Sequence, residues 1–155
     1  MRYFLKDAWH SLDEKDCVTV LEGTRDFEKT TQALRRDGTT VAMCLIYAPW
    51  CGHCHEYVPE YIEHAPYLSK DMSIFLVNGD DSTGEPFEPK GVQFQGFPTL
   101  IMFNPRTRAW EPWTDSRKDF KLMRSKACAV KKKHSKRRKN IDFDSDDDGG
   151  MLWIS

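Results

Sequence analysis

The sequence predicts an α/β fold with a central mixed β-sheet and helices on both faces. Apolar runs recur at 17–22, 39–48, 72–78 and 94–103, and segments with a helical pattern separate the first three. The run at 39–48 is nearly uninterrupted, which is typical of a central parallel strand that is covered on both faces. Alternating strands and helices favour a sheet flanked by helices.

The first half of the chain supplies a strand, a helix and the central strand. Residues 17–22 alternate between polar and apolar side chains, as a half-buried strand does. Thr24 is predicted to cap the helix that follows, and Gly38 is predicted to end it. The apolar run 39–48 comes next and leads into the cysteines.

The second half repeats this order. A helix is predicted over 55–70, where Pro59 should kink it and Pro66 should kink it again or end it. Strands are predicted at 72–78 and 94–103.

An edge strand at 109–115 and a last helix complete the fold. Ser116 is expected to start that helix, because Ser-Arg-Lys-Asp has capping-box spacing. Its apolar stripe, which ends at Val130, is predicted to face the core.

Composition indicates one domain with tails. The chain has 155 residues, of which 39% are hydrophobic, and a net charge of -1. We divide it into an N-terminal extension (1–16), a domain (17–130) and a disordered tail (131–155). The tail is basic and then acidic: 131–139 holds seven of the 23 Lys and Arg, and 142–148 holds five of the 24 Asp and Glu.

No address for a membrane or for export is visible. Lys6, Asp7 and Asp13 interrupt the apolar residues at the N-terminus, so the pattern of a secretory signal is missing. The terminal Met-Leu-Trp-Ile-Ser does not resemble an endoplasmic-reticulum retention signal, and no stretch reaches the roughly 20 apolar residues of a membrane span. We expect a cytoplasmic protein, with nuclear and virion-associated locations as alternatives.

Two of the five cysteines form a motif. Cys51 and Cys54 lie in Cys-Gly-His-Cys-His, which fits a redox dithiol, half of a zinc site or a haem c attachment sequence. A structural zinc ion needs four ligands, and there is no second Cys-x-x-Cys and no His-x-x-x-His. His55 and His64 are expected to be surface residues. Haem attachment normally takes place after export, for which the chain carries no signal, so the redox dithiol is favoured.

The surrounding residues resemble the thioredoxin fold, and within it the catalytic domains of protein disulfide isomerases. The carrying motifs are Tyr-Ala-Pro-Trp-Cys-Gly-His-Cys at 47–54, Pro59, and Phe-Gln-Gly-Phe-Pro-Thr at 94–99. The resemblance covers about 17–130. It implies a thiol–disulfide oxidoreductase that acts on protein thiols and disulfides, with no cofactor beyond its own Cys51–Cys54 disulfide and no metal.

The position of the two cysteines supports these roles. A strand that delivers Cys51 to a helix start places its sulfur near unpaired N–H groups and the positive helix end, which favours the thiolate. Cys51 is therefore expected to be the exposed nucleophile. Cys54, one turn later, should be more buried and should resolve the mixed disulfide. His53 is expected to add a donor or partial positive charge near the Cys51 sulfur.

The resemblance also implies a substrate surface. In the family the proline of the Gly-Phe-Pro-Thr segment is cis and faces the dithiol, so Phe97 and Pro98 would pair with a substrate chain, beside Trp50 and Gly52. A purely structural role for Pro98 is the alternative, since prolines are common where strands begin.

One departure concerns proton transfer. The family usually carries a buried acid six residues before the first cysteine, partnered by a lysine on the next strand; here the positions hold Leu45 and Leu76. We expect the fold to tolerate this change and mixed disulfides to be released slowly. Cys44 should point to the opposite face, and Cys17 and Cys128 should be packing residues, with pairing to a partner as their alternative.

The tail leaves further functions open. The basic run 131–139 suits nucleic acid, bound through phosphates, or an import receptor; the alternative is a solvated segment that interacts with its acidic neighbour. Ser145 precedes three aspartates and fits an acidophilic-kinase site, and 151–155 would suit docking through Trp153. Besides an oxidoreductase, a structural or docking component of a larger, viral assembly with weak turnover fits the chain.

Overall fold

The computed structural model describes residues 17–80 and 87–141, with side chains through Lys131. Within these ranges five strands form one sheet in the order β1-β3-β2-β4-β5. β3 is parallel to both β1 and β2, whereas β4 is antiparallel to β2 and β5 is antiparallel to β4. The strands are β1 (Thr19–Leu21), β2 (Ala42–Tyr47), β3 (Ser73–Asn78), β4 (Thr99–Asn104) and β5 (Ala109–Pro112).

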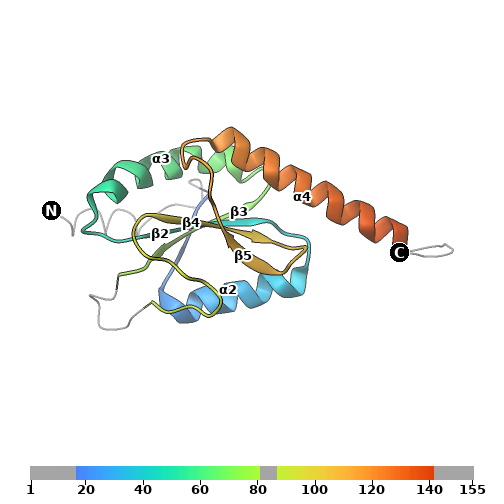
Figure 1. Ribbon diagram of the computed structural model, residues 1–155, viewed down its shortest axis with the longest axis horizontal. Helices are drawn as coiled ribbons and strands as arrows, with labels where there is room; N and C mark the ends of the chain where they lie inside the picture. The colour runs from blue at the N-terminus through green and yellow to red at the C-terminus, as the bar shows by residue number, and fades with distance from the viewer. Residues whose placement is uncertain (1–16, 81–86, 142–155) are drawn as a thin grey trace.

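Helices cover both faces of this sheet, as predicted. Helix α2 (Gly23–Asp37) lies on one face, and α3 (Gly52–Leu68) and α4 (Phe120–Ile141) lie on the other (Figure 1). Every residue of β2 is buried, because alternate side chains enter two apolar clusters. Leu45 lies in the cluster under α3 and α4, and Cys44 lies in the cluster under α2, which confirms their opposite faces.

Helix α2 starts earlier than predicted. Its N-cap is Glu22, not Thr24, and the Glu22 N–H donates to the carboxylate of Asp26 at 3.0 Å. The Thr24 hydroxyl instead accepts the backbone N–H of Glu88 at 2.9 Å. The predicted stop is confirmed: Gly38 adopts a left-handed conformation, with φ 75°, and its N–H donates to the Leu34 carbonyl.

Helix α3 contains both of its prolines. It runs through Pro59 and Pro66 to Leu68, so the predicted alternative of an end at Pro66 is wrong. Each proline removes one helical hydrogen bond. The helix persists because its buried face, which includes Val58 and Ala65, packs on the sheet.

Helix α4 starts later and ends later than predicted. Ser116 begins a turn, and Asp119 provides the cap: its carboxylate accepts the Leu122 N–H at 3.0 Å. The predicted stripe does face the core, with Phe120 and Met123 buried in it. The helix continues to Ile141, so the domain boundary drawn at residue 130 falls inside it.

The other predictions about the tails lie mostly outside the described residues. These are the N-terminal extension 1–16, the acidic run 142–148 and the docking segment 151–155. In the part of the chain that the structure does describe, no helix is both long and apolar enough to cross a membrane.

Candidate active site

The turn after β2 places Cys51 at the start of α3. The strand ends at Tyr47, and Cys51 serves as the N-cap of the helix, with an extended backbone. The N–H of Cys51 donates to the Ala48 carbonyl at 3.1 Å, which closes the turn. The N–H of Cys54 donates to the Cys51 sulfur at 3.4 Å. An otherwise unpaired N–H at the helix start thus points at this sulfur.

The two sulfurs differ in exposure. Cys51 is 6% exposed and Cys54 is fully buried. The expectation of an exposed nucleophile is therefore wrong in degree, while the expected order of burial is confirmed. Cys51 is largely covered because its thiol lies against the segment that precedes β4. The thiol donates to the Phe97 carbonyl there at 3.4 Å.

Burial keeps Cys54 in its protonated form. Loss of solvent raises the pKa of Cys54 from 9.0 to about 12. The Ala48 backbone lowers this pKa, the Cys51 thiol raises it, and the guanidinium of Arg117 lowers it again. Within one helical turn, Cys51 therefore keeps a small exposed area, whereas Cys54 has none.

A row of three leucines crosses the sheet in the same apolar cluster as the buried Cys54 thiol. Leu45 on β2 pairs with Leu76 on β3 and with Leu100 on β4, and all three are buried in the cluster that contains Cys54. The predicted pairing of Leu45 with Leu76 is confirmed. Neither of these two positions supplies a carboxylate to the cluster that contains Cys54.

The segment opposite the dithiol contains Phe97 and Pro98, joined by a cis peptide bond. The Phe97 ring meets the Trp50 indole edge to face, with ring centroids 5.7 Å apart. Trp50 is 49% exposed, although it is large and apolar. Gly52 is exposed, and a methyl group in place of its hydrogen would meet open space. These four predicted site residues thus lie around Cys51.

Sequence reasoning missed Gly79, which supports Phe97. Its N–H donates to the Tyr47 carbonyl at 2.8 Å, directly after β3. A Cβ atom here would overlap the Ile46 side chain and lie 2.9 Å from the Phe97 ring. Gly79 therefore lets the ring approach the sheet closely. Its sequence context, one residue after a strand, gives no sign of this role.

Helix α3 and the loop before α4 form a hollow beside the site. It has a volume of about 410 Å³ and includes exposed His53 and the Arg117 side chain. Arg117 lies over the Tyr57 ring, 5.6 Å from its centroid, and donates to the Pro98 carbonyl at 3.4 Å. The Cys51 sulfur forms hydrogen bonds with the Phe97 carbonyl and the Cys54 N–H, and the role of His53 at this sulfur stays a prediction.

Two histidines contradict their prediction as surface residues. His55 is half-buried, and its Nε2 lies 2.6 Å from the Pro49 carbonyl, to which it donates. His64 is also half-buried, because its ring stacks on Phe120 with centroids 3.9 Å apart. His55 therefore anchors the turn before Cys51, and His64 joins α3 to α4.

The remaining cysteines lie away from the dithiol. Cys44 is buried, and burial raises the pKa of its thiol. Cys17 is half-buried and packs against the core. Burial and the neighbouring Asp71 carboxylate raise the pKa of Cys128. The interpretation of these cysteines as packing residues suits these surroundings.

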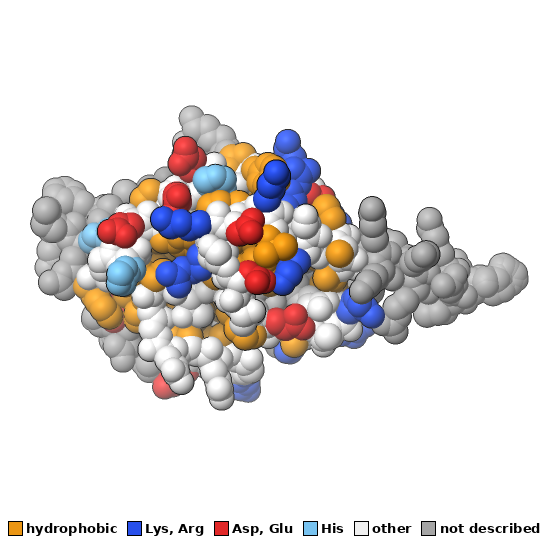
Figure 2. Space-filling view, turned by 45° about the horizontal axis from the view of Figure 1, so that its top comes forward, with side chains coloured by type: hydrophobic (Ala, Val, Ile, Leu, Met, Phe, Trp, Pro, Cys, Tyr) orange, Lys and Arg blue, Asp and Glu red, His pale blue; other side chains and the backbone are white. Residues whose placement is uncertain are grey.

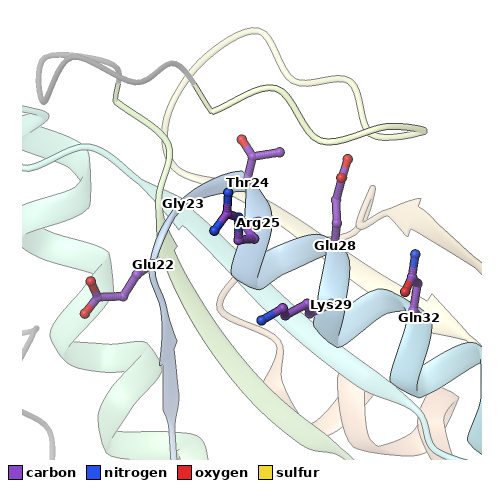
Figure 3. A pocket seen from close by; sticks show the side chains of 7 residues that line it. All are labelled: Glu22, Gly23, Thr24, Arg25, Glu28, Lys29 and Gln32. Carbon is purple, nitrogen blue, oxygen red and sulfur yellow. The ribbon is translucent and has the colours of Figure 1, made fainter.

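A second hollow lies at the start of α2, of about 490 Å³. Figure 3 shows its side chains, which carry both signs of charge; Thr24, Glu28 and Gln32 point to the same side of α2. It is lined by Glu22, Gly23, Thr24, Arg25, Glu28, Lys29 and Gln32. Helix α2 covers the sheet face opposite α3, so this hollow is separate from the dithiol (Figure 1). Among the residues that the structure describes, no group of His, Cys, Asp or Glu is arranged to hold a metal ion.

Protein disulfide isomerases are among the relatives of this chain. It is 35% identical to protein disulfide-isomerase A2 of Mus musculus over 78 residues, which are 50% of this chain and 15% of that protein. It is 48% identical to a protein disulfide-isomerase of Hordeum vulgare over 60 residues, 37% of this chain and 12% of the relative. The chain thus spans less than a fifth of the length of these two relatives.

Solved structures agree on the fold. The first thioredoxin domain of mouse protein disulfide-isomerase A4 superposes with a TM-score of 0.56 at 20% identity, over 75% of this chain and 76% of that one. The J-Trx1 fragment of ERdj5 gives 0.53 at 22% identity, over 75% and 52%. The family model for thioredoxin matches residues 19–125, more than half of the chain. The chain therefore belongs to the thioredoxin family.

Proposed function

We propose that this chain exchanges disulfides with protein substrates through Cys51 and Cys54. One observation carries the proposal: the Cys51 sulfur caps α3, accepts the Cys54 N–H and lies against the Phe97 carbonyl. A hydrogen-bond donor and the positive helix end stabilise negative charge on that sulfur. Family membership and the isomerase relatives support the same chemistry.

The reaction needs only the two cysteines and a substrate disulfide. The Cys51 thiolate attacks one substrate sulfur, the substrate S–S bond breaks, and the other sulfur leaves as a thiolate that takes up a proton. Cys54 then loses its proton and attacks Cys51, which releases the second substrate thiolate. Two electrons pass to the substrate, and a Cys51–Cys54 disulfide remains. The reverse sequence oxidises a substrate dithiol.

The surface around Cys51 would hold the substrate chain. Trp50 and Phe97 offer aromatic area beside the sulfur, and Gly52 leaves the approach open. When a substrate arrives, the Phe97 carbonyl would exchange its bond with the Cys51 thiol for one with the substrate backbone. Pro98 lacks an N–H and would fix the direction of that carbonyl.

Turnover should be limited by the second step. Cys54 is buried beside Leu45, Leu76 and Leu100, and burial raises its pKa to about 12. Since neither Leu45 nor Leu76 supplies a carboxylate, we expect the proton to leave to water or to the substrate thiolate. Arg117 partly offsets this, since its charge lowers the Cys54 pKa.

Reduction of insulin disulfides by the full chain tests the proposal. We expect activity that is lost in Cys51→Ser, whereas Cys54→Ser should accumulate a mixed disulfide with insulin. Activity that survives Cys51→Ser would overturn the assignment of the nucleophile. Recovery of scrambled ribonuclease tests isomerisation separately from reduction.

The leucine row is the one observation that favours a second function, in which the domain serves for docking. Replacement of the usual ion pair by Leu45 and Leu76 suits a domain that retains the fold for docking and turns over little. Absence of insulin reduction by a folded chain, together with an unreactive Cys51 thiol, would favour this docking function. A cytoplasmic location remains a prediction from the sequence.

A further inference from the structure

Helix α4 has two parts with different surroundings. Its first part packs on the body, where Phe120, Met123 and Ala127 are buried. Its last part extends beyond the edge of the sheet and beyond α2 (Figure 1). The helix has 22 residues, and about eleven of them follow Val130.

The charge of α4 has one sign. Its sequence, Phe-Lys-Leu-Met-Arg-Ser-Lys-Ala-Cys-Ala-Val-Lys-Lys-Lys-His-Ser-Lys-Arg-Arg-Lys-Asn-Ile, contains ten Lys and Arg and no Asp or Glu. On the α3 and α4 face of the body, Figure 2 shows acidic and basic side chains mixed. Residues 1–130 contain 16 Lys and Arg against 19 Asp and Glu.

The body provides acidic partners for the first part of the helix. Arg124 forms a salt bridge with Asp71, and Lys126 pairs with Asp115 at 2.6 Å. Lys131 lies 4.0 Å from the Asp71 carboxylate and donates to the Asp71 carbonyl at 3.2 Å. Beyond Lys131 the helix leaves the body, and six more Lys and Arg follow from 132 to 139.

We propose that this basic helical arm, residues 132–139, binds the phosphates of double-stranded DNA. Eight helical residues span about 12 Å, so the arm carries about one positive charge per 2 Å. Duplex DNA carries about one negative charge per 1.7 Å of its axis, which is a close match in charge density. Like charges three and four residues apart repel one another along the helix, and phosphates between them would relieve this repulsion.

The residue types of the arm favour duplex DNA over single-stranded nucleic acid and lipid surfaces. Between Lys131 and Asn140 it has no Phe, Tyr or Trp for stacking on unpaired bases, and no apolar residue for insertion into a lipid surface. The major groove of B-form DNA admits a helix, whereas the groove of A-form RNA is too narrow. The binding is therefore expected to be independent of sequence and strongly salt-dependent.

The test titrates the full chain against a labelled DNA duplex of about 20 base pairs, roughly two turns, and follows fluorescence anisotropy. With six phosphates contacted, log K should fall against log salt with a slope of about -5, at about 0.9 per contact. From about 50 to about 200 mM salt the affinity should fall by about a thousandfold. The quadruple variant K136Q, R137Q, R138Q, K139Q should flatten the slope by about 3.6.

A matched control removes four positive charges from the body. Arg25, Lys29, Arg36 and Lys70 are exposed there, and their replacement by glutamine should leave the slope unchanged. If both quadruple variants lost the same amount of DNA affinity, the effect would come from net charge only, and this result would overturn the proposal. Vesicles containing phosphatidylserine, or an RNA duplex, bound as tightly as DNA would also overturn it. Cys51→Ser should bind DNA like the parent, so this test is independent of the redox function.

Discussion

Replacing Leu45 by glutamate and Leu76 by lysine should restore proton transfer to and from Cys54. The two leucines are register partners on neighbouring strands, and both are fully buried in the layer of Cys54. The pair must be introduced together, because an unpaired buried carboxylate costs about 3–5 kcal/mol. In the double variant each charge satisfies the other.

The size of the effect follows from the environment of Cys54. Burial raises its pKa from 9.0 to about 12, which lowers the thiolate fraction at pH 7 by about a thousandfold, about 4 kcal/mol. A general base in position typically contributes a factor of about 10² to 10⁴. We therefore expect the mixed disulfide to be released about a hundredfold faster in L45E/L76K. The rate of attack by Cys51 should change little, because the hydrogen bonds of its sulfur are to the Phe97 carbonyl and the Cys54 N–H, which the two substitutions do not replace.

Rapid-quench trapping of the mixed disulfide with a model peptide disulfide measures release directly. In the parent, release should accelerate about tenfold for each pH unit up to a pKa of about 12; in the variant it should level off above the pKa of the introduced carboxylate. L45Q is the control, because the glutamine side chain is as long as the glutamate side chain of the variant but carries no titratable group. A folded L45E/L76K that releases peptide at the parental rate would refute the argument.

Three further changes have defined consequences. Arg117→Ala should raise the Cys54 pKa further and slow release by up to about fivefold, since an exposed charge contributes up to about 1 kcal/mol. Gly79→Ala should displace the Phe97 ring and destabilise the fold by about 1–3 kcal/mol in urea unfolding, because its Cβ overlaps filled space. Asp37 has a pKa lowered to about 2 by hydrogen bonds from two threonines, so it stabilises the fold above about pH 4 and this contribution disappears as the pH falls towards 2. Asp37→Ala should remove up to about 1 kcal/mol at pH 7 and flatten the acid side of the stability curve.

Each of these changes has a matched control. Lys118→Ala removes the same charge next to Arg117, and it should leave release unchanged. Gly96→Ala adds a methyl group that meets open space, so its stability should stay near that of the parent. Asp37→Asn keeps an acceptor oxygen without the titration. Loss of stability on acidification in Asp37→Asn equal to that of the parent would contradict the role of the carboxylate.

Strand positions were predictable because burial leaves a direct mark on sequence. β1, β2, β3 and β5 fall within their predicted runs, whereas β4 starts at Thr99 and ends at Asn104, against a predicted 94–103. The central run at 39–48 is apolar on both faces, as β2 requires. The pairing of Leu45 with Leu76 was predicted from the resemblance to the thioredoxin fold, whose buried acid and lysine occupy these positions, and the strand register confirms it.

Helix ends were harder, because several residues compete for the same N–H groups. Thr24 and Ser116 both have good capping chemistry, yet Glu22 and Asp119 hold the N-cap positions. In the structure the Thr24 hydroxyl bonds to a backbone N–H 64 residues away. Only the tertiary fold brings that partner close, so local sequence cannot decide the helix start.

Local sequence likewise could not predict the contacts of site residues that depend on the tertiary fold. The motif identified Cys51, but its burial comes from the Phe97 carbonyl, 46 positions away in the chain. His55 resembled a surface residue because its partner, the Pro49 carbonyl, is a backbone group without a sequence signature. Such contacts need the folded chain.

The two halves of disulfide exchange depend on different parts of this fold. Capture depends on the start of α3, where a helix N–H points at the Cys51 sulfur. In the proposed reaction, release depends on the sheet, where Leu45 and Leu76 lie in the cluster of Cys54 and supply no carboxylate. Changes in the row should therefore alter the lifetime of the mixed disulfide without altering its formation. In the proposed reaction, the leucine row would therefore set how long a substrate stays bound to Cys51.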